Sequence, residues 1–152
     1  MAAQTFTASD QNAQPRSTAD GGPVTVYFSY ITGTTLTTLS VSDVILLTKL
    51  PEGCKIIDGY ICGKIPSQTG NLVKVGILPG TATDDDLISG VTLSATTVLK
   101  RFDGSAGLPY ALPAIAAATY PKYTYLTLTC VSGSMTASVS LQGSVTYLTG
   151  GL

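Results

Sequence analysis

The residue types that most often carry acid–base, nucleophilic and metal chemistry are scarce in this sequence. There is no histidine, which removes Ser-His-Asp and Cys-His catalysis and the commonest metal ligand together. Glu52 is the only glutamate and lies in a Pro-Glu-Gly turn. Glycoside hydrolysis needs two facing carboxylates, and the spacing of Asp58, Asp103 and the run Asp84 to Asp86 favours no pair. We therefore expect no enzyme activity, no catalytic residue and no cofactor.

Two short segments resemble ligand-binding motifs without matching them. Residues Gly59 to Lys64 read GYICGK. A phosphate-binding loop has four residues between its glycines rather than three, and here Ile65 replaces its Ser or Thr. The aspartates Asp84 to Asp86 supply hard oxygen atoms of the kind that hold Ca²⁺. Consecutive residues cannot all face one ion, so a helical turn capped by Thr83 or Asp84 is the favoured interpretation, and we expect no metal site.

The three cysteines, Cys54, Cys62 and Cys130, cannot all pair within one chain. Cys54 and Cys62 flank one predicted strand, along which they would lie about 26 Å apart, far beyond disulfide reach. A bridge between Cys62 and Cys130 stays open if their strands are neighbours. A zinc site would have to combine scattered cysteines with carboxylates. Free thiols in a protein made in the cytoplasm are therefore the simplest interpretation.

Charged residues make up only 11% of the 152 residues, against about 25% in a typical soluble domain. A monomer with so few charges is poorly protected against association, whereas a subunit of an assembly hides much of its surface. We therefore expect a self-associating protein, with a neutral monomer covered by Thr and Ser as the alternative.

The charge and the hydropathy pattern also exclude two classes of partner. The net charge is −1, and Lys100 and Arg101 are the only adjacent basic residues, so we expect no basic face for nucleic acid. No apolar run reaches the about 18 residues that cross a bilayer, and the N-terminal residues lack the apolar core of a secretory signal. We expect a cytoplasmic product that contacts neither nucleic acid nor membrane.

The first 23 residues differ from the rest of the chain. They are polar, with Phe6 as their only large apolar side chain, and cannot bury enough surface to offset the entropy of ordering. We predict a flexible N-terminal arm over 1–23, with two alternatives open: it orders against a neighbour, or it is an unstructured terminus without a role. From Val24 onward, apolar and polar residues alternate, which is typical of strands. The predicted strands are 24–32, 44–50, 54–65, 72–78, one or two within 91–102, 123–131 and 137–147.

The pattern within these strands also predicts which residues pack together. Strands 123–131 and 137–147 are separated by Ser132-Gly133-Ser134 and are predicted to form a hairpin. Within 54–65, glycines inside a strand often mark a bulge or a close backbone approach, and alternation places five residues on one face: Ile57, Gly59, Ile61, Gly63 and Ile65. About eight strands with a turn every 8 to 12 residues or so predict a jelly-roll-like antiparallel β-sandwich over 24–152.

Two groups of side chains are candidate contact residues. Tyr27, Tyr123 and Tyr125 stand at alternating positions beside Thr and Ser. Lectin-like sandwiches stack sugars on exposed aromatic rings, but cross-strand packing or a subunit interface is the favoured interpretation. The segment 108–120 has hardly any polar side chains, which favours contact with another subunit. The candidate contact residues within it are Leu108, Tyr110, Leu112 and Ile115.

Several features together resemble one group of proteins. They are the polar arm, a chain that ends just after a strand, and the segments LPEGCKIIDGYICG (50–63) and LVKVGILPGTATDDDLISG (72–90). The group is that of the small auxiliary virion proteins of tailed bacteriophages, known as capsid decoration or cement proteins. The resemblance implies a jelly-roll or related sandwich that sits on the assembled shell as a dimer or trimer. It also implies a location on the capsid surface after synthesis in the host bacterial cytoplasm.

The resemblance implies no catalytic residue, and it implies that the arm and the edge loops contact the major capsid protein. The segment Thr5 to Arg16, which includes Phe6, is the predicted clamp. Such a protein would bridge neighbouring capsid subunits after the shell has expanded. Two alternatives stay open: the base or adaptor of a head or tail fibre, and a carbohydrate-binding β-sandwich module.

Overall fold

The structure is a computed structural model that describes residues 5–7, 22–31, 39–51, 53–65, 70–78, 87–103, 107–112, 124–133 and 139–149. All regular secondary structure in these residues is β-strand. Within them no helix is long and apolar enough to cross a bilayer. The strands are β1 (Thr5–Thr7), β2 (Pro23–Ile31), β3 (Val44–Leu50), β4 (Lys55–Lys64), β5 (Asn71–Leu78), β6 (Ile88–Leu93), β7 (Val98–Arg101), β8 (Tyr110–Ala111), β9 (Thr124–Cys130) and β10 (Ser140–Leu148).

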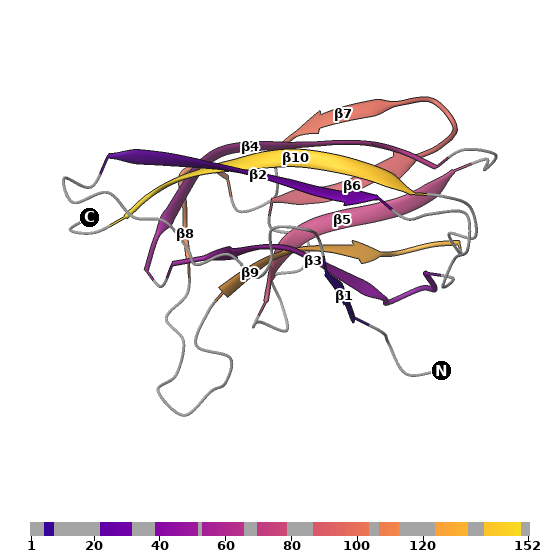
Figure 1. Cartoon of the computed structure of the whole chain (residues 1–152), viewed down its shortest axis with the longest axis horizontal. Coiled ribbons are helices and arrows are strands. Elements are labelled where there is room, and N and C mark those ends of the chain that lie inside the picture. Colours follow the sequence, from indigo (N-terminus) through magenta and orange to yellow (C-terminus); the bar gives the residue numbers. More distant parts are fainter. Residues whose placement is uncertain are drawn as a thin grey trace.

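The strands form two layers, which we name after their central strands (Figure 1). The β9 sheet has the order β1-β3-β9-β5-β6, and the β10 sheet has the order β2-β10-β4-β7, with β8 paired to β4. Successive strands among the eight that are longer than three residues lie in opposite layers, except for β5 and β6, which pair within the β9 sheet. This is the strand order of a jelly roll. All their pairings are antiparallel. The predicted fold class is therefore confirmed.

Alternating side chains explain how each strand faces the core. In β10, Leu141, Val145 and Tyr147 are fully buried, while the intervening Gln142 is exposed. Val73, Val75 and Ile77 of β5 likewise point inward. The hydrophobic core lies between the layers, since these residues join buried side chains from β3, β4, β6 and β9 in one cluster. Each sheet has one apolar face, and the two sheets bury these faces by packing against each other.

The predicted hairpin over 123–147 is wrong. β9 pairs with β3 and β5 in one sheet, whereas β10 pairs with β2 and β4 in the other. The chain therefore crosses from one layer to the opposite layer between Cys130 and Ser140. The alternating pattern of each strand is identical whether its neighbour in sequence lies beside it or across the core, so the local signal could not distinguish the two connections.

The predicted common face of β4 is wrong at one residue. Thr146 of β10 pairs with Asp58, but Tyr147 pairs with Ile56, which leaves Ile57 as the extra residue of a bulge. A bulge shifts the alternation by one residue. Ile56 is therefore fully buried and Ile57 only partly, while Gly59, Ile61, Gly63 and Ile65 share one face as predicted, and this face is buried.

A bridge between Cys62 and Cys130 does not form, and all three cysteines are free thiols. Cys62 lies on β4 and Cys130 on β9, and these strands belong to opposite layers. Of the other sequence-based expectations, Glu52, the Asp84 to Asp86 loop and most of the 108–120 segment lie outside the described residues.

Candidate interaction surface

The described residues contain no group of three or more His, Cys, Asp or Glu side chains that could hold a metal ion. The two buried thiols are also poor nucleophiles. Burial raises the pKa of Cys54 to about 12. Burial raises that of Cys130 to about 11, and the nearby negative charge of Asp43 adds to the shift. Reactive cysteines need a lowered pKa and access to solvent, so neither thiol has the properties of a catalytic group.

The outer face of the β10 sheet carries a row of four side chains that run across all its main strands. Tyr27 of β2 pairs with Ser144 of β10, Ser144 pairs with Tyr60 of β4, and Tyr60 pairs with Arg101 of β7. Tyr27 is 67% exposed, whereas Ser144 between the two tyrosines is buried. We call these four residues the tyrosine row. It places an aromatic ring at the margin of the sheet, where another molecule can reach it.

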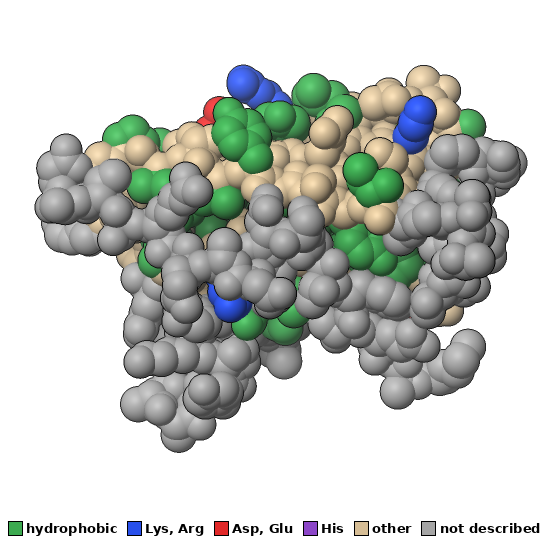
Figure 2. Space-filling model, in the orientation of Figure 1, with side chains coloured by type: hydrophobic (Ala, Val, Ile, Leu, Met, Phe, Trp, Pro, Cys, Tyr) green, Lys and Arg blue, Asp and Glu red, His purple; other side chains and the backbone are tan. Residues whose placement is uncertain are grey.

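The residues beside the tyrosine row are mostly neutral. The hydroxyls of Thr25 and Thr146 share a hydrogen bond of 2.8 Å on the same face. The pair between the Arg101 guanidinium and the Asp58 carboxylate is loose at 3.8 Å and exposed, so it adds little stability. On the face shown in Figure 2, the described surface has few Lys, Arg, Asp or Glu side chains, and hydrophobic side chains are scattered over it.

On the other side of the tyrosine row the face has a shallow polar hollow of about 260 Å³. Gln142 and Cys62, which are paired across β10 and β4, lie next to the row. Lys64 supplies the one charged side chain of the hollow. The lining residues are Cys62, Gly63, Lys64, Thr97, Ser140 and Gln142.

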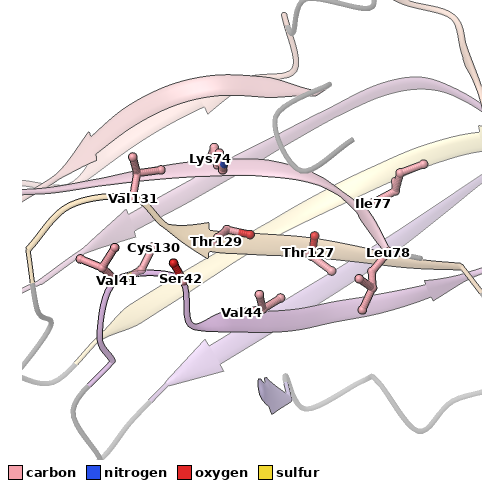
Figure 3. A pocket seen from close by; sticks show the side chains of 10 residues that line it. All are labelled: Val41, Ser42, Val44, Lys74, Ile77, Leu78, Thr127, Thr129, Cys130 and Val131. Atoms are coloured by element: carbon pink, nitrogen blue, oxygen red, sulfur yellow. The ribbon is translucent and has the colours of Figure 1, made fainter. Parts of the chain in front are cut away.

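The outer face of the β9 sheet has a larger hollow of about 320 Å³ (Figure 3). Val44 pairs with Thr129, and Thr129 pairs with Lys74, the only charged residue of the lining. In Figure 3, Val41 and Ser42 lie at one end of the hollow and Leu78 at the other. Thr127 and Thr129 are almost fully buried on this face. The full lining is Val41, Ser42, Val44, Lys74, Ile77, Leu78, Thr127, Thr129, Cys130 and Val131.

The predicted arm contacts this sheet through its described residues. Thr5 and Phe6 lie on β1, which pairs in parallel with β3 and places Thr5 opposite Val44, at the margin of the larger hollow. Parallel pairing at the sheet edge joins the arm to the domain by backbone hydrogen bonds. Arg16 lies outside the described residues.

The second predicted contact segment is divided between core and surface. Leu108 is 36% exposed, and Tyr110 on β8 is partly buried against the core. Leu112 is buried in the core, and its N–H donates to the carbonyl of Cys54 at 3.1 Å. Ile115 lies outside the described residues. Of the described members, Leu108 is thus the one whose side chain faces solvent.

The structure does not bring together the tyrosines considered for sugar stacking. Tyr27 lies on the outer face of the β10 sheet, whereas Tyr125 lies on β9 in the opposite layer. Tyr123 lies outside the described residues. Sequence reasoning did not single out two exposed apolar residues of the β10 sheet, Ile31 at 73% and Leu99 at 63%. For Ile31, the available signal in the sequence was that residues 23–31 contain no charged side chain.

No protein-family model matches the sequence, and no curated protein matches it. Solved structures do share its fold. A chain in the structure "Capsid of Ralstonia phage GP4" aligns with a TM-score of 0.68 at 16% identity, over 97% of this chain and 99% of that one. A chain of the "Cyanophage Pam1 capsid asymmetric unit" aligns with a TM-score of 0.58 at 15% identity, over 93% and 95%. The jelly roll described above is thus similar, over nearly its whole length, to chains found in two phage capsids.

Proposed function

We propose that this chain is a non-catalytic structural protein of a bacteriophage virion, which binds the outside of the capsid and links neighbouring capsid subunits. The observation that carries the proposal is the end-to-end likeness to a chain of the Ralstonia phage GP4 capsid, which covers 97% of this chain and 99% of the other. A similarity that spans the full length of both chains favours a shared role. A similarity to only one part of a larger protein would favour it less. The second capsid chain, from cyanophage Pam1, supports the same role.

The character of the surface supports an assembled state. Charged residues are 11% of the sequence, and the outer face of the β10 sheet exposes Tyr27, Ile31 and Leu99. Exposed charge is what normally keeps monomers apart in solution. A protein whose surface is shared with copies of itself and with a capsid needs less of it. Three free cysteines also agree with synthesis in a reducing bacterial cytoplasm.

The proposed clamp on the major capsid protein is the segment Thr5 to Arg16, together with the exposed Leu108. β1, which contains the first three residues of this segment, lies at the edge of the β9 sheet beside β3. Contacts that exist only in the mature lattice stabilise that lattice by linkage. Repetition over many copies makes a weak single contact strong for the whole particle.

Reconstitution on capsid shells tests the proposal. Shells assembled from the major capsid protein of the same phage, without this chain, should bind the purified protein at a fixed ratio in a density gradient. The decorated shells should also disrupt at a higher temperature in a thermal scan. A ratio that never saturates, or an unchanged disruption temperature, would contradict the proposal.

The clamp is tested by deletion of residues 1–20, with deletion of residues 1–4 as the matched control. The longer deletion removes β1, whereas the control retains it. We expect both proteins to keep the circular dichroism spectrum of a β-sandwich, because every core residue among those that the structure describes lies between Val24 and Tyr147. Only the longer deletion should lower the occupancy of shells. Equal occupancy for both deletions would refute the clamp.

A further inference from the structure

The four sheet edges of this sandwich are unequally protected against pairing with another strand. β1 has only three residues. β6 has six, and its pairing with β5 contains a register shift. β7 has four, two of them Lys100 and Arg101. Short length, irregular register and charged side chains are the devices by which proteins prevent edge-to-edge association. Three of the four edges carry at least one of them.

The fourth edge, β2, carries none of these devices. It has nine residues, PVTVYFSYI, without a charged side chain, and its proline is the first residue. All nine pair consecutively with β10 without a register shift. Among the described residues no strand pairs with the other side of β2, which is the terminal strand of its sheet (Figure 1). A long, regular and uncharged edge is a template for a further strand.

We propose that β2 pairs in antiparallel fashion with β2 of a second copy, about a two-fold axis at Tyr27. The pair would join the two β10 sheets into one continuous sheet. This inference rests on the self-association that is part of the proposed function, and it names the surface responsible. An edge-to-edge strand pair supplies partners for backbone N–H and C=O groups, so the backbone itself selects a strand as the occupant.

The composition of β2 makes a second copy a suitable occupant. When a nine-residue strand pairs with itself over its full length, its central residue, Tyr27, lies opposite Tyr27 of the second copy. In the same register the inward-facing Val26 lies opposite Phe28, and Val24 lies opposite Tyr30. Apolar residues thus meet apolar residues, and no like charges face each other, since the strand has none. Such cross-strand aromatic and β-branched pairs stabilise a sheet.

The symmetry of this contact limits its size. Each copy uses the same strand, so the contact closes after two copies and cannot extend into a fibre. A contact about 30 Å long and one sheet layer of about 10 Å wide is smaller than the about 800 Å² per partner of a standard interface. We therefore expect a dimer that dissociates on dilution and is strengthened where a capsid holds copies side by side.

Sedimentation of two matched variants tests the proposal. Tyr27→Lys places like charges opposite each other at the two-fold axis. Leu99→Lys adds the same charge to the same face, but on β7 at the far edge. The two side chains are similarly exposed, at 67% and 63%, so both variants should fold like the wild type. Between about 1 and 300 µM, the wild type and Leu99→Lys should form a dimer, and Tyr27→Lys should stay monomeric.

Disulfide trapping provides an independent readout of register. Residues directly opposite each other in an antiparallel pair have Cα atoms about 4.5–5.5 Å apart, within disulfide range. In a Cys62→Ser background, Tyr27→Cys should therefore form a covalent dimer under mild oxidation, and Leu99→Cys should not. Equal cross-linking of the two variants, a dimer that survives Tyr27→Lys, a monomer at every concentration or a discrete trimer would each overturn the proposal.

The shell-binding assay separates this inference from the proposed function. If the protein binds shells but forms no Tyr27-dependent dimer, only the edge pairing is refuted. A chain that dimerises through Tyr27 but never binds shells refutes only the capsid role.

Discussion

The aromatic ring of Phe102 lies where a side chain at Gly59 would begin. A Cβ at Gly59 would overlap the ring, and the Phe102 N–H donates to the Gly59 carbonyl at 2.9 Å. Phe102 is buried, so its ring has little room to move. β4 thus needs a glycine at this position to let a core side chain cross its inner face, which is the kind of close approach that glycine permits inside a strand.

We predict that Gly59→Ala destabilises the fold by about 1–3 kcal/mol, the usual cost of overpacking a core. Chemical denaturation would measure the loss. Combining it with Phe102→Leu, which shortens the opposing side chain, should give a double variant less destabilised than the sum of the two single changes. Gly90→Ala is the matched control, because its Cβ would meet only the end of the Leu72 side chain, at 3.2 Å. Equal losses at Gly59 and Gly90 would show that the ring contact is unimportant.

The three thiols should differ in reactivity. Cys54 and Cys130 are buried with raised pKa values, whereas Cys62 lines the hollow on the outer face of the β10 sheet. With Ellman's reagent at neutral pH, one thiol per folded chain should react, and the other two should react only after denaturation. Cys62→Ser should abolish the reaction of the folded protein. Reaction of more than one thiol in the folded wild type would mean that the core opens readily.

The same pKa shifts predict that stability falls in alkali. The pKa of Cys54 rises from 9.0 to about 12, and that of Cys130 from 9.0 to about 11, so the folded state holds these protons more tightly than the unfolded state. Below pH 9 both states are protonated and nothing is lost. Above it the unfolded state releases protons first, which lowers the free energy of unfolding by up to about 1.4 kcal/mol per pH unit and thiol.

Urea denaturation at several pH values between 8 and about 11 would measure this slope. The pKa of Tyr30 is also raised by burial, so its phenol adds to the loss above its ordinary value of 10.0. Cys54→Ala should make the slope shallower, because it removes one of the two thiols with a raised pKa. A free energy of unfolding that does not vary with pH in this range would contradict the predicted burial of the thiols.

Asp43 should be needed for the turn that precedes β3. Its carboxylate accepts a hydrogen bond from the Ser40 N–H at 2.7 Å, and its own N–H donates to the Ser40 carbonyl at 3.0 Å. Its carbonyl accepts from the Cys130 N–H at 3.0 Å, which ties the turn to β9. Asp43 is 3% exposed, so Asp43→Ala leaves a donor without its acceptor and should cost about 1–3 kcal/mol.

Thermal denaturation of Asp43→Ala beside Asp43→Asn tests the role of this oxygen. The amide of asparagine keeps an oxygen acceptor in the same place, so Asp43→Asn should recover most of the loss. Failure of Asp43→Asn to recover any stability would show that the charge matters rather than the hydrogen bond to Ser40.

The local pattern of the sequence predicts strands, the residues that share a face and the fold class, but not which strands are neighbours. The alternation of Leu141, Gly143 and Val145 follows directly from the period of a strand, and the structure confirms it. The pairing of β9 with β5 rather than with β10 depends on how two layers close around one core. That is decided by contacts between residues far apart in sequence, which periodicity does not contain.

The candidate surface was predictable only in part, for a related reason. The outward position of Tyr27 follows from alternation, but its place beside Ser144 and Tyr60 requires the order of the strands. The position of Leu112 shows the opposite limit. An apolar segment predicts burial without saying whether the core or another subunit buries it, and in the structure Leu112 belongs to the core.

The first and last long strands of the sandwich are neighbours, and their register has a practical consequence. Pro23 at the beginning of β2 lies opposite Leu148 at the end of β10, so residues 23–148, which leave out β1, begin and end at points about 5 Å apart. A domain with such closely spaced ends can be inserted into a surface loop of another protein without forcing that loop open. The fold is therefore suited to serve as a graftable module for display, carried by a host protein at a single exposed turn.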